Sequence, residues 1–161
     1  MQVNANQAAD FIKILHPTLE SNNLSHVAIS CCEATGWNTQ SQYTQQLKSA
    51  GVENLLGIIT GHTYTSGIGG PQPTTRKVWE TECSDLSGGW STSWYSYGGA
   101  GDGYTWANNI YTGLTTGNVS AYLWVSELRF RKPSPRTFPS CSPLHVKFMS
   151  KLHSGGYRSP G

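Results

Sequence analysis

Carboxylates, a histidine and aromatic residues occur where short apolar runs of this sequence end. Glu82 closes the run 77–82 (KVWETE), and Gly- and Trp-rich sequence follows it. The run 55–61 (LLGIITG) is followed directly by His62 and, two residues later, by Tyr64. Paired carboxyl groups can flank a glycosidic bond, and aromatic rings stack on sugar faces. Glu82 is therefore the expected catalytic carboxylate of a glycoside-cleaving site.

The other polar residues at the ends of these apolar runs are weaker candidates for a role in catalysis. Glu80 lies two residues before Glu82, so both side chains are expected on the same face of the strand. Glu80 is expected to be structural or to tune the pKa of Glu82. Glu33 is a conceivable second carboxylate, but hydrogen bonding within its own loop is the favoured interpretation. His62 and Tyr64 are expected to orient Glu82 or to bind a sugar hydroxyl, with ordinary packing as the alternative.

Four of the six tryptophans are candidate platforms for sugar rings. Trp37, Trp90 and Trp124 are predicted to bind substrate, and Trp94 is a further candidate; ordinary packing is the alternative for each. Trp106 shares a helical stripe with apolar residues three to four positions apart, so it is expected in the core.

Several other chemistries are disfavoured. The glycine string 98–103 follows a loop and lacks a Lys-Ser/Thr ending, which argues against nucleotide binding. No CxxC and no Cys/His pair at zinc spacing occurs, so neither a metal nor a cofactor is expected. Cys31 and Cys32 are adjacent and are not expected to bridge each other. A disulfide from one of them to Cys83, or free buried thiols, are the alternatives.

Apolar periodicity predicts alternating helices and strands. A helix over 6–15 is expected to stop at Pro17, and a helix over 41–50 to be capped by Gly51. A third helix is expected to begin at Asp102 or Thr105. Strands are predicted over 26–32, 55–61, 77–82 and 118–124. This order predicts an α/β fold with a parallel sheet, about half of a (β/α)8 TIM barrel.

Length and composition agree with one folded domain. The chain has 161 residues, of which 11% are aromatic and only 12% charged, unlike a disordered protein. No apolar stretch approaches the ~18 residues of a membrane span, so no membrane partner is expected. The first residues show no basic and apolar signal-peptide pattern.

The net charge of +2 hides two unlike parts. Residues 1–126 hold four Lys/Arg and eight Asp/Glu, whereas residues 127–161 hold seven Lys/Arg and Glu127 alone. All six tryptophans lie in the first part. We therefore predict a folded segment over 1–124 and a basic, Pro/Ser-rich, disordered tail over 125–161. Scattered charge and Pro/Ser breaks disfavour nucleic acid as a partner of this tail.

Five motifs in unbroken order resemble fungal glycoside hydrolase family 30. They are CCEATGW (31–37), GIITGHTY (57–64), VWETE (78–82), GGAGDGYTWANNI (98–110) and NVSAYLW (118–124). The resemblance covers roughly residues 1–124. It implies a retaining glycosidase with a (β/α)8 barrel and an adjoining β-sandwich, of which this chain would supply about strands five to eight.

The resemblance also implies residue roles. The family nucleophile is the Glu of a Trp-x-Thr-Glu motif, which matches residues 79–82, so Glu82 inherits that role. The family acid/base Glu lies in an Asn-Glu-Pro motif, and this sequence contains none. A partial barrel that lacks the acid/base and is inactive alone is therefore expected. The sequence also departs from the family pattern after Trp124.

The implied substrate is a plant cell-wall polysaccharide, with β-1,4-xylan (glucuronoxylan) favoured. A β-1,6-galactanase or another family 30 β-glycosidase is the alternative, and an inactive glycan-binding remnant or truncated gene product is a further one. A secreted parent protein is expected. Unpaired strand edges of a half barrel would favour self-association.

Overall fold

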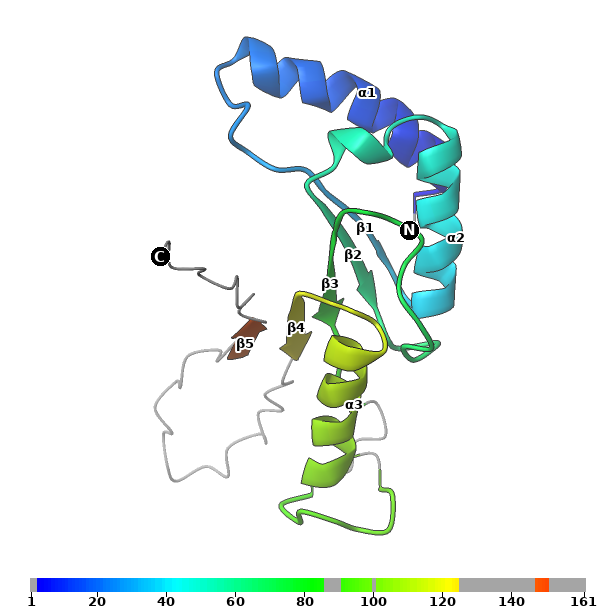
Figure 1. Cartoon of the computed structure of the whole chain (residues 1–161), viewed down its shortest axis with the longest axis vertical. Helices are drawn as coiled ribbons and strands as arrows, with labels where there is room; N and C mark the ends of the chain where they lie inside the picture. The colour runs from blue at the N-terminus through cyan, green and yellow to red at the C-terminus, as the bar shows by residue number, and fades with distance from the viewer. Residues whose placement is uncertain (1–2, 86–90, 100, 125–146, 151–161) are drawn as a thin grey trace, which may run out of the picture.

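The computed structural model of the protein describes residues 3–85, 91–99, 101–124 and 147–150. Four parallel strands lie side by side in chain order, β1 to β4, and a fifth strand pairs antiparallel with β4 (Figure 1). The strands are β1 Ser30–Ala34, β2 Ile58–His62, β3 Lys77–Glu82, β4 Ala121–Trp124 and β5 Lys147–Ser150. This α/β sheet is the predicted partial barrel, and it does not close within the described residues.

Three α-helices and one short 3₁₀ helix accompany these strands. They are α1 Ala5–Ser21, α2 Trp37–Ser49, η1 Glu53–Leu55 and α3 Gly103–Thr115. In Figure 1, α1 and α2 lie together beside β1 and β2, while α3 lies near β4. As predicted, a helix connects β1 to β2 and another connects β3 to β4, whereas residues 63–76, which join β2 to β3, contain no helix.

Several predicted boundaries were wrong. The first strand begins at Ser30 and continues to Ala34, later than the predicted 26–32. The second begins at Ile58, because residues 53–55 form η1 instead. The helix expected over 41–50 begins at Trp37, whose N–H donates to the carbonyl of Ser66. Periodicity marked each element, but tertiary contacts set its ends.

Pro17 does not end the first helix. The helix α1 starts with a capping box between Asn4 and Gln7 and continues to Ser21. Proline removes one backbone donor, which usually kinks or breaks a helix. Past Pro17, the side chains of Thr18 and Asn22 donate to the carbonyls of Ile14 and Thr18, so the last turn keeps additional hydrogen bonds.

The tail contains a strand that the sequence did not predict. Residues 147–150 form β5, with Ala121 opposite Ser150 and Trp124 opposite Lys147. A half barrel was expected to leave the outer edges of its first and last strands unpaired. The outer edge of β4 is instead paired with β5 of the same chain. The remaining tail residues, 125–146 and 151–161, lie outside the described part.

An extra residue interrupts the pairing of β1 with β2. Cys32 pairs with Thr60 and Ala34 pairs with Gly61, so Glu33 has no partner position in β2. Glu33 also has φ 59°, in the left-handed region that non-glycine residues rarely occupy. A bulge of this kind turns a side chain away from the regular alternation of a strand.

A second extra residue lies on the other side of β2. Gly61 pairs with Glu80 and His62 pairs with Glu82, which leaves Thr81 without a partner position. β2 is thus one residue short against both of its neighbours at the carboxyl end of the sheet. The bulged residues are Glu33 on one side and Thr81 on the other.

The buried side chain of Gln40 supports the first bulge from below. Its amide oxygen accepts the backbone N–H of Ala34 at 3.1 Å, and the residue is 0% exposed. Gly61 makes room for it, because a Cβ on Gly61 would lie 2.8 Å from the Gln40 side chain. The backbone donor next to the bulge is therefore satisfied by a side chain.

The hydrophobic core lies between the sheet and its helices. Trp106, predicted to be buried, is only partly buried and packs against this core. Among the described residues, no helix is both long and apolar enough to cross a bilayer. The fully buried apolar side chains include Leu47, Val52, Leu56, Ile59 and Val119.

Asp102, one of the two predicted starts, is the N-cap of α3. Its carboxylate accepts the backbone N–H of Thr105 and both the N–H and the hydroxyl of Ser96. These hydrogen bonds, those from Thr105 first, lower the pKa of Asp102 to about 2. The cap therefore joins the loop after β3 to the helix that follows it.

Replacing a core isoleucine will test the packing. Ile59→Ala, at a side chain 0% exposed on the interior strand β2, should lower the free energy of unfolding by about 2–5 kcal/mol. The matched control, Ile14→Ala on α1, removes a side chain 66% exposed and should change it by no more than about 0.5 kcal/mol. Urea titrations give both values, and equal losses would contradict this core.

Candidate active site

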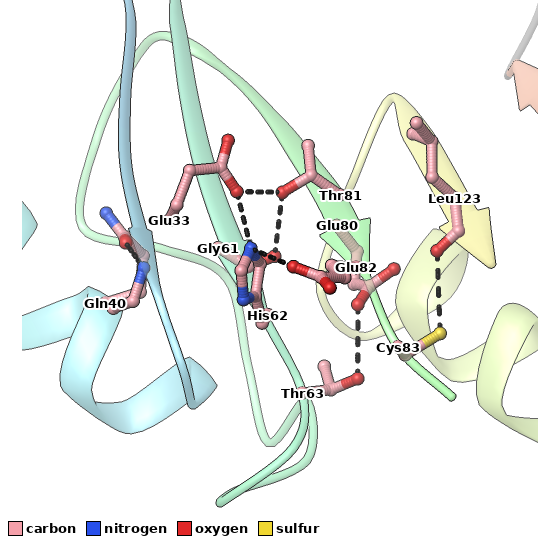
Figure 2. Close-up of polar contacts among 11 residues, drawn as sticks. Glu33, Gln40, Gly61, His62, Thr63, Glu80, Thr81, Glu82, Cys83 and Leu123 are labelled. Carbon is pink, nitrogen blue, oxygen red and sulfur yellow. Dashed lines mark hydrogen bonds and ion pairs between the residues drawn. The ribbon is translucent and has the colours of Figure 1, made fainter. Parts of the chain in front are cut away.

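Three strand ends place their polar side chains together at one edge of the sheet. Glu33 comes from β1, His62 is the last residue of β2 and Glu82 is the last residue of β3. Figure 2 shows the three side chains converging, with Thr81 beside the Glu33 carboxylate. In (β/α)8 barrel enzymes, the catalytic residues lie at the carboxyl ends of the parallel strands.

The imidazole of His62 lies between two carboxylates. Its Nε2 is 2.7 Å from Glu33 Oε2 and 3.3 Å from Glu82 Oε2. The His62 side chain is 12% exposed, whereas those of Glu33 and Glu82 are 48% and 42% exposed. One ring nitrogen thus contacts two carboxylates that solvent, and hence a substrate, can reach.

Tyr64 completes the surroundings of Glu82. Burial is the main cause that raises the pKa of the Tyr64 phenol, and hydrogen bonding to Glu82 raises it further, while Ser84 lowers it. The ring of Tyr64 meets that of His62 edge-on, with centroids 5.8 Å apart. Both aromatic residues of the β2 end therefore lie beside the Glu82 carboxylate.

Glu80 lies below this site and is fully buried. One oxygen accepts the hydroxyl of Thr63 at 3.2 Å, and the other has no partner among the described residues. Burial raises the pKa of Glu80 to about 8, although Thr63 and Cys83 lower it. Glu80 is therefore mostly a neutral carboxylic acid at pH 7.

A thiol and a phenol extend this buried layer. Cys83 Sγ lies 3.5 Å from the hydroxyl of Tyr122 and 3.5 Å from the carbonyl oxygen of Leu123. Burial, with Glu80 as a second cause, raises the pKa of Cys83 to about 12, and burial also raises that of Tyr122. Cys83 is thus an unreactive structural thiol.

Glu82 has the properties that nucleophilic attack requires. It ends a rigid strand, its carboxylate is accessible, and His62 and Tyr64 contact it from the side. A carboxylate in this setting can form a covalent glycosyl ester. Glu80, one layer lower, is shielded from solvent and carries a proton, so the two acidic residues of β3 differ in burial.

The chain was compared with protein-family models and with solved structures. No family model matches the chain. A solved structure, the catalytic domain of GH30 xylanase C from Talaromyces cellulolyticus, matches it with a TM-score of 0.70 and 43% sequence identity. The match covers 76% of this chain and 28% of that chain.

This chain therefore resembles part of the catalytic domain of a glycoside hydrolase family 30 xylanase. The match confirms the predicted resemblance and the partial-barrel fold. The chain spans under a third of the length of its relative, so the whole enzyme's activity does not follow from the match alone. That Glu82 is the family nucleophile stays a prediction, with which its exposed position is compatible.

The aromatic residues predicted to bind substrate have different surroundings. Trp37 is 3% exposed in the core, and its indole N–H donates to the carbonyl of Gly70 at 2.8 Å. Its prediction as a sugar platform was wrong, because helix α2 starts early and turns the ring inward. Trp90 lies outside the described residues. His62 and Tyr64, in contrast, both adjoin Glu82.

Trp124 lines a cavity between β4 and α3. The cavity has a volume of about 500 Å³, and its walls include Trp94, Trp106 and Tyr122. The rings of Trp106 and Trp124 are tilted, with centroids 5.3 Å apart. Two of the predicted platforms, Trp94 and Trp124, therefore line the same aromatic cavity.

The cysteines of β1 are paired with each other. Cys31 and Cys32 form a disulfide, and Cys83 is free and buried. The expectation that adjacent cysteines would not bridge was wrong, and the alternative of a bond to Cys83 is excluded. Cys83 instead points toward Tyr122, in the layer beneath the site. Within the described ranges, no group of three His, Cys, Asp or Glu is placed to hold a metal ion.

Sequence reasoning missed the joint role of Glu33 and Thr81. Glu33 was expected to bond within its own loop, but its partners are His62 of β2 and Thr81 of β3. Thr81 was not singled out at all. The only signal in the sequence was that Glu33 and Thr81 lie near the ends of predicted strands. A bulge cannot be recognised from the apolar periodicity of a sequence.

Replacing Glu80 will test its buried, neutral state. Its pKa of about 8 when folded, against 4.5 ordinarily, means that the folded chain keeps a proton that the unfolded chain loses. Stability should therefore fall as the pH rises from about 4.5 to about 8. Glu80→Gln keeps the shape without the titration, so its thermal midpoint should fall less across this range.

The matched control is Glu20→Gln, at an exposed carboxylate on α1. Its thermal midpoint should fall across this pH range as that of the wild type does. Thermal unfolding followed by circular dichroism at several pH values measures all three proteins. An identical pH dependence for wild type and Glu80→Gln would contradict the assignment of a buried carboxylic acid.

Proposed function

We propose that this chain carries the nucleophilic part of a retaining β-xylan hydrolase, with Glu82 as the nucleophile. The observation that carries the proposal is the accessible Glu82 carboxylate at a parallel strand end, in contact with His62 and Tyr64. The 43% identity to a xylanase catalytic domain supports xylan as the substrate. A β-1,6-galactan is the runner-up, and a polysaccharide substrate implies a secreted parent protein.

In the proposed reaction, a Glu82 oxygen attacks the anomeric carbon of the sugar in the cleaved bond. The bond to the leaving oxygen breaks, and that oxygen takes the electron pair and a proton from a general acid. Water then hydrolyses the glycosyl ester, so the configuration is retained. The family places the general acid in an Asn-Glu-Pro motif, which this sequence does not contain.

A substrate with a good leaving group tests the nucleophile without that acid. Dinitrophenolate leaves as a stable anion and needs no proton, so 2,4-dinitrophenyl 2-deoxy-2-fluoro-β-xylobioside requires only the attack by Glu82. The fluorine slows hydrolysis of the ester, so the adduct accumulates. The wild-type chain should gain one fluoroxylobiosyl group, located on Glu82 by peptide mass spectrometry.

Glu82→Gln should give no adduct, because an amide is a poor nucleophile. Glu20→Gln, a matched change at a remote exposed carboxylate, should label like wild type. Label on a residue other than Glu82, or no label on the wild type, would refute the proposed nucleophile. Faster labelling by the corresponding fluorogalactoside would favour the galactanase reading.

The aromatic cavity beside Trp124 favours a second candidate, glycan binding without cleavage. Aromatic rings with nearby Ser and Thr hydroxyls suit sugar recognition, and the walls hold Trp94, Trp106 and Ser91. Calorimetry with xylohexaose distinguishes the two functions. Binding that is unchanged in Glu82→Gln, together with no labelling of the wild type, would support the binding function.

A further inference from the structure

We propose that Glu33 is a positioning residue that acts on Glu82 through His62. The inference deepens the proposed function and rests on it, since it needs Glu82 to be the reacting carboxylate. Glu33 itself does not touch the reacting atoms. Its role is to fix the ring that contacts the nucleophile.

The contacts determine which atom of His62 carries a proton. Nε2 faces Glu33 Oε2 at 2.7 Å and Glu82 Oε2 at 3.3 Å, and both oxygens are acceptors. A ring nitrogen between two carboxylates must donate, so Nε2 bears hydrogen in this arrangement. The shorter contact is to Glu33, which therefore sets the ring orientation. Glu82 accepts a weaker hydrogen bond from the same N–H.

Thr81 fixes Glu33 from the opposite side. The Thr81 hydroxyl donates to the same oxygen, Glu33 Oε2, that accepts from His62 (Figure 2). Thr81 Oγ1 also lies 3.4 Å from the carbonyl oxygen of Gly61. Glu33 is thus held between β2 and β3 although it belongs to β1.

The backbone is arranged for this contact. Glu33 and Thr81 are the extra residues of the two bulges that flank β2, and their side chains meet across that strand. Glu33 adopts φ 59°, a conformation that costs free energy for a residue with a side chain. Bulges near active sites redirect side chains, which is the effect seen here.

A rival role for Glu33 is that of the missing general acid. A general acid must donate its own proton to the leaving oxygen. Glu33 Oε2 instead accepts from two donors, His62 and Thr81, so that oxygen is already occupied as an acceptor. The geometry therefore favours positioning over proton donation.

The effect on Glu82 follows from its exposure. A carboxylate whose side chain is 42% exposed can rotate among several rotamers, and few of them point at an anomeric carbon. A fixed His62 limits that freedom. Misplacement by about 1 Å can cost about a hundredfold in rate, so the loss should appear in the rate of attack rather than in binding.

Two variants of Glu33 separate the effect of side-chain length from the effect of side-chain charge. Glu33→Asn tolerates the left-handed backbone but is one methylene too short to reach His62. Glu33→Gln keeps the length and an amide oxygen that can still accept from Nε2–H. The matched control is Glu20→Asn, which removes an exposed contact to His16 on α1, where Nδ1 and Oε2 are 3.6 Å apart.

The first measurement is the rate of labelling by the dinitrophenyl fluoroxylobioside. Glu33→Asn should label roughly a hundredfold slower than wild type, with the dissociation constant of the reagent unchanged. Glu33→Gln should stay within about tenfold of wild type, because it keeps the acceptor. Glu20→Asn should label normally. Labelling of Glu33→Asn at the wild-type rate would overturn the inference and leave the proposed nucleophile intact.

The second measurement needs no catalysis. Nitrogen-15 NMR of the full chain should show His62 protonated at Nε2, with a ring N–H signal that exchanges slowly. That signal should persist in Glu33→Gln and Glu20→Asn and disappear in Glu33→Asn. A wild type without a protonated Nε2 overturns the inference, whatever the labelling shows. A wild type with this signal but without labelling refutes the nucleophile and, with it, the positioning role.

Discussion

The pairing register of β2 is the constraint on which the candidate site depends. β2 is one residue short against β1 and against β3, so Glu33 and Thr81 have no partner positions and their side chains meet above it. The same offset brings His62 opposite Glu82. A regular sheet would shift these side chains to alternating faces, because the side-chain period of a strand is two residues.

Burial separates the two acidic residues of β3. Glu80 is 0% exposed and retains its proton near neutral pH, whereas Glu82 reaches solvent at the strand end. The layer around Glu80, which includes Cys83 and Tyr122, is polar and buried beneath the site. Two glutamates two residues apart thus differ in chemistry because one side chain is removed from water.

Much of the fold could be predicted from the sequence. The β-α order, strand 77–82, the cap at Asp102 and the parallel sheet follow from apolar periodicity and capping residues. The start of α2, the continuation of α1 past Pro17 and the strand β5 could not, since each depends on contacts with distant residues. Trp37 was misassigned for the same reason, because its burial depends on where α2 begins.

Residue types and order in the sequence were enough to predict the resemblance to family 30, the α/β class and Glu82 as the candidate nucleophile. Only the tertiary structure decided that Glu33 turns toward His62, that Cys31 pairs with Cys32, and that Glu80 is buried. The physical reason is that strand register and burial arise between segments. A bulge changes which side chains meet without changing the local periodicity that a sequence displays.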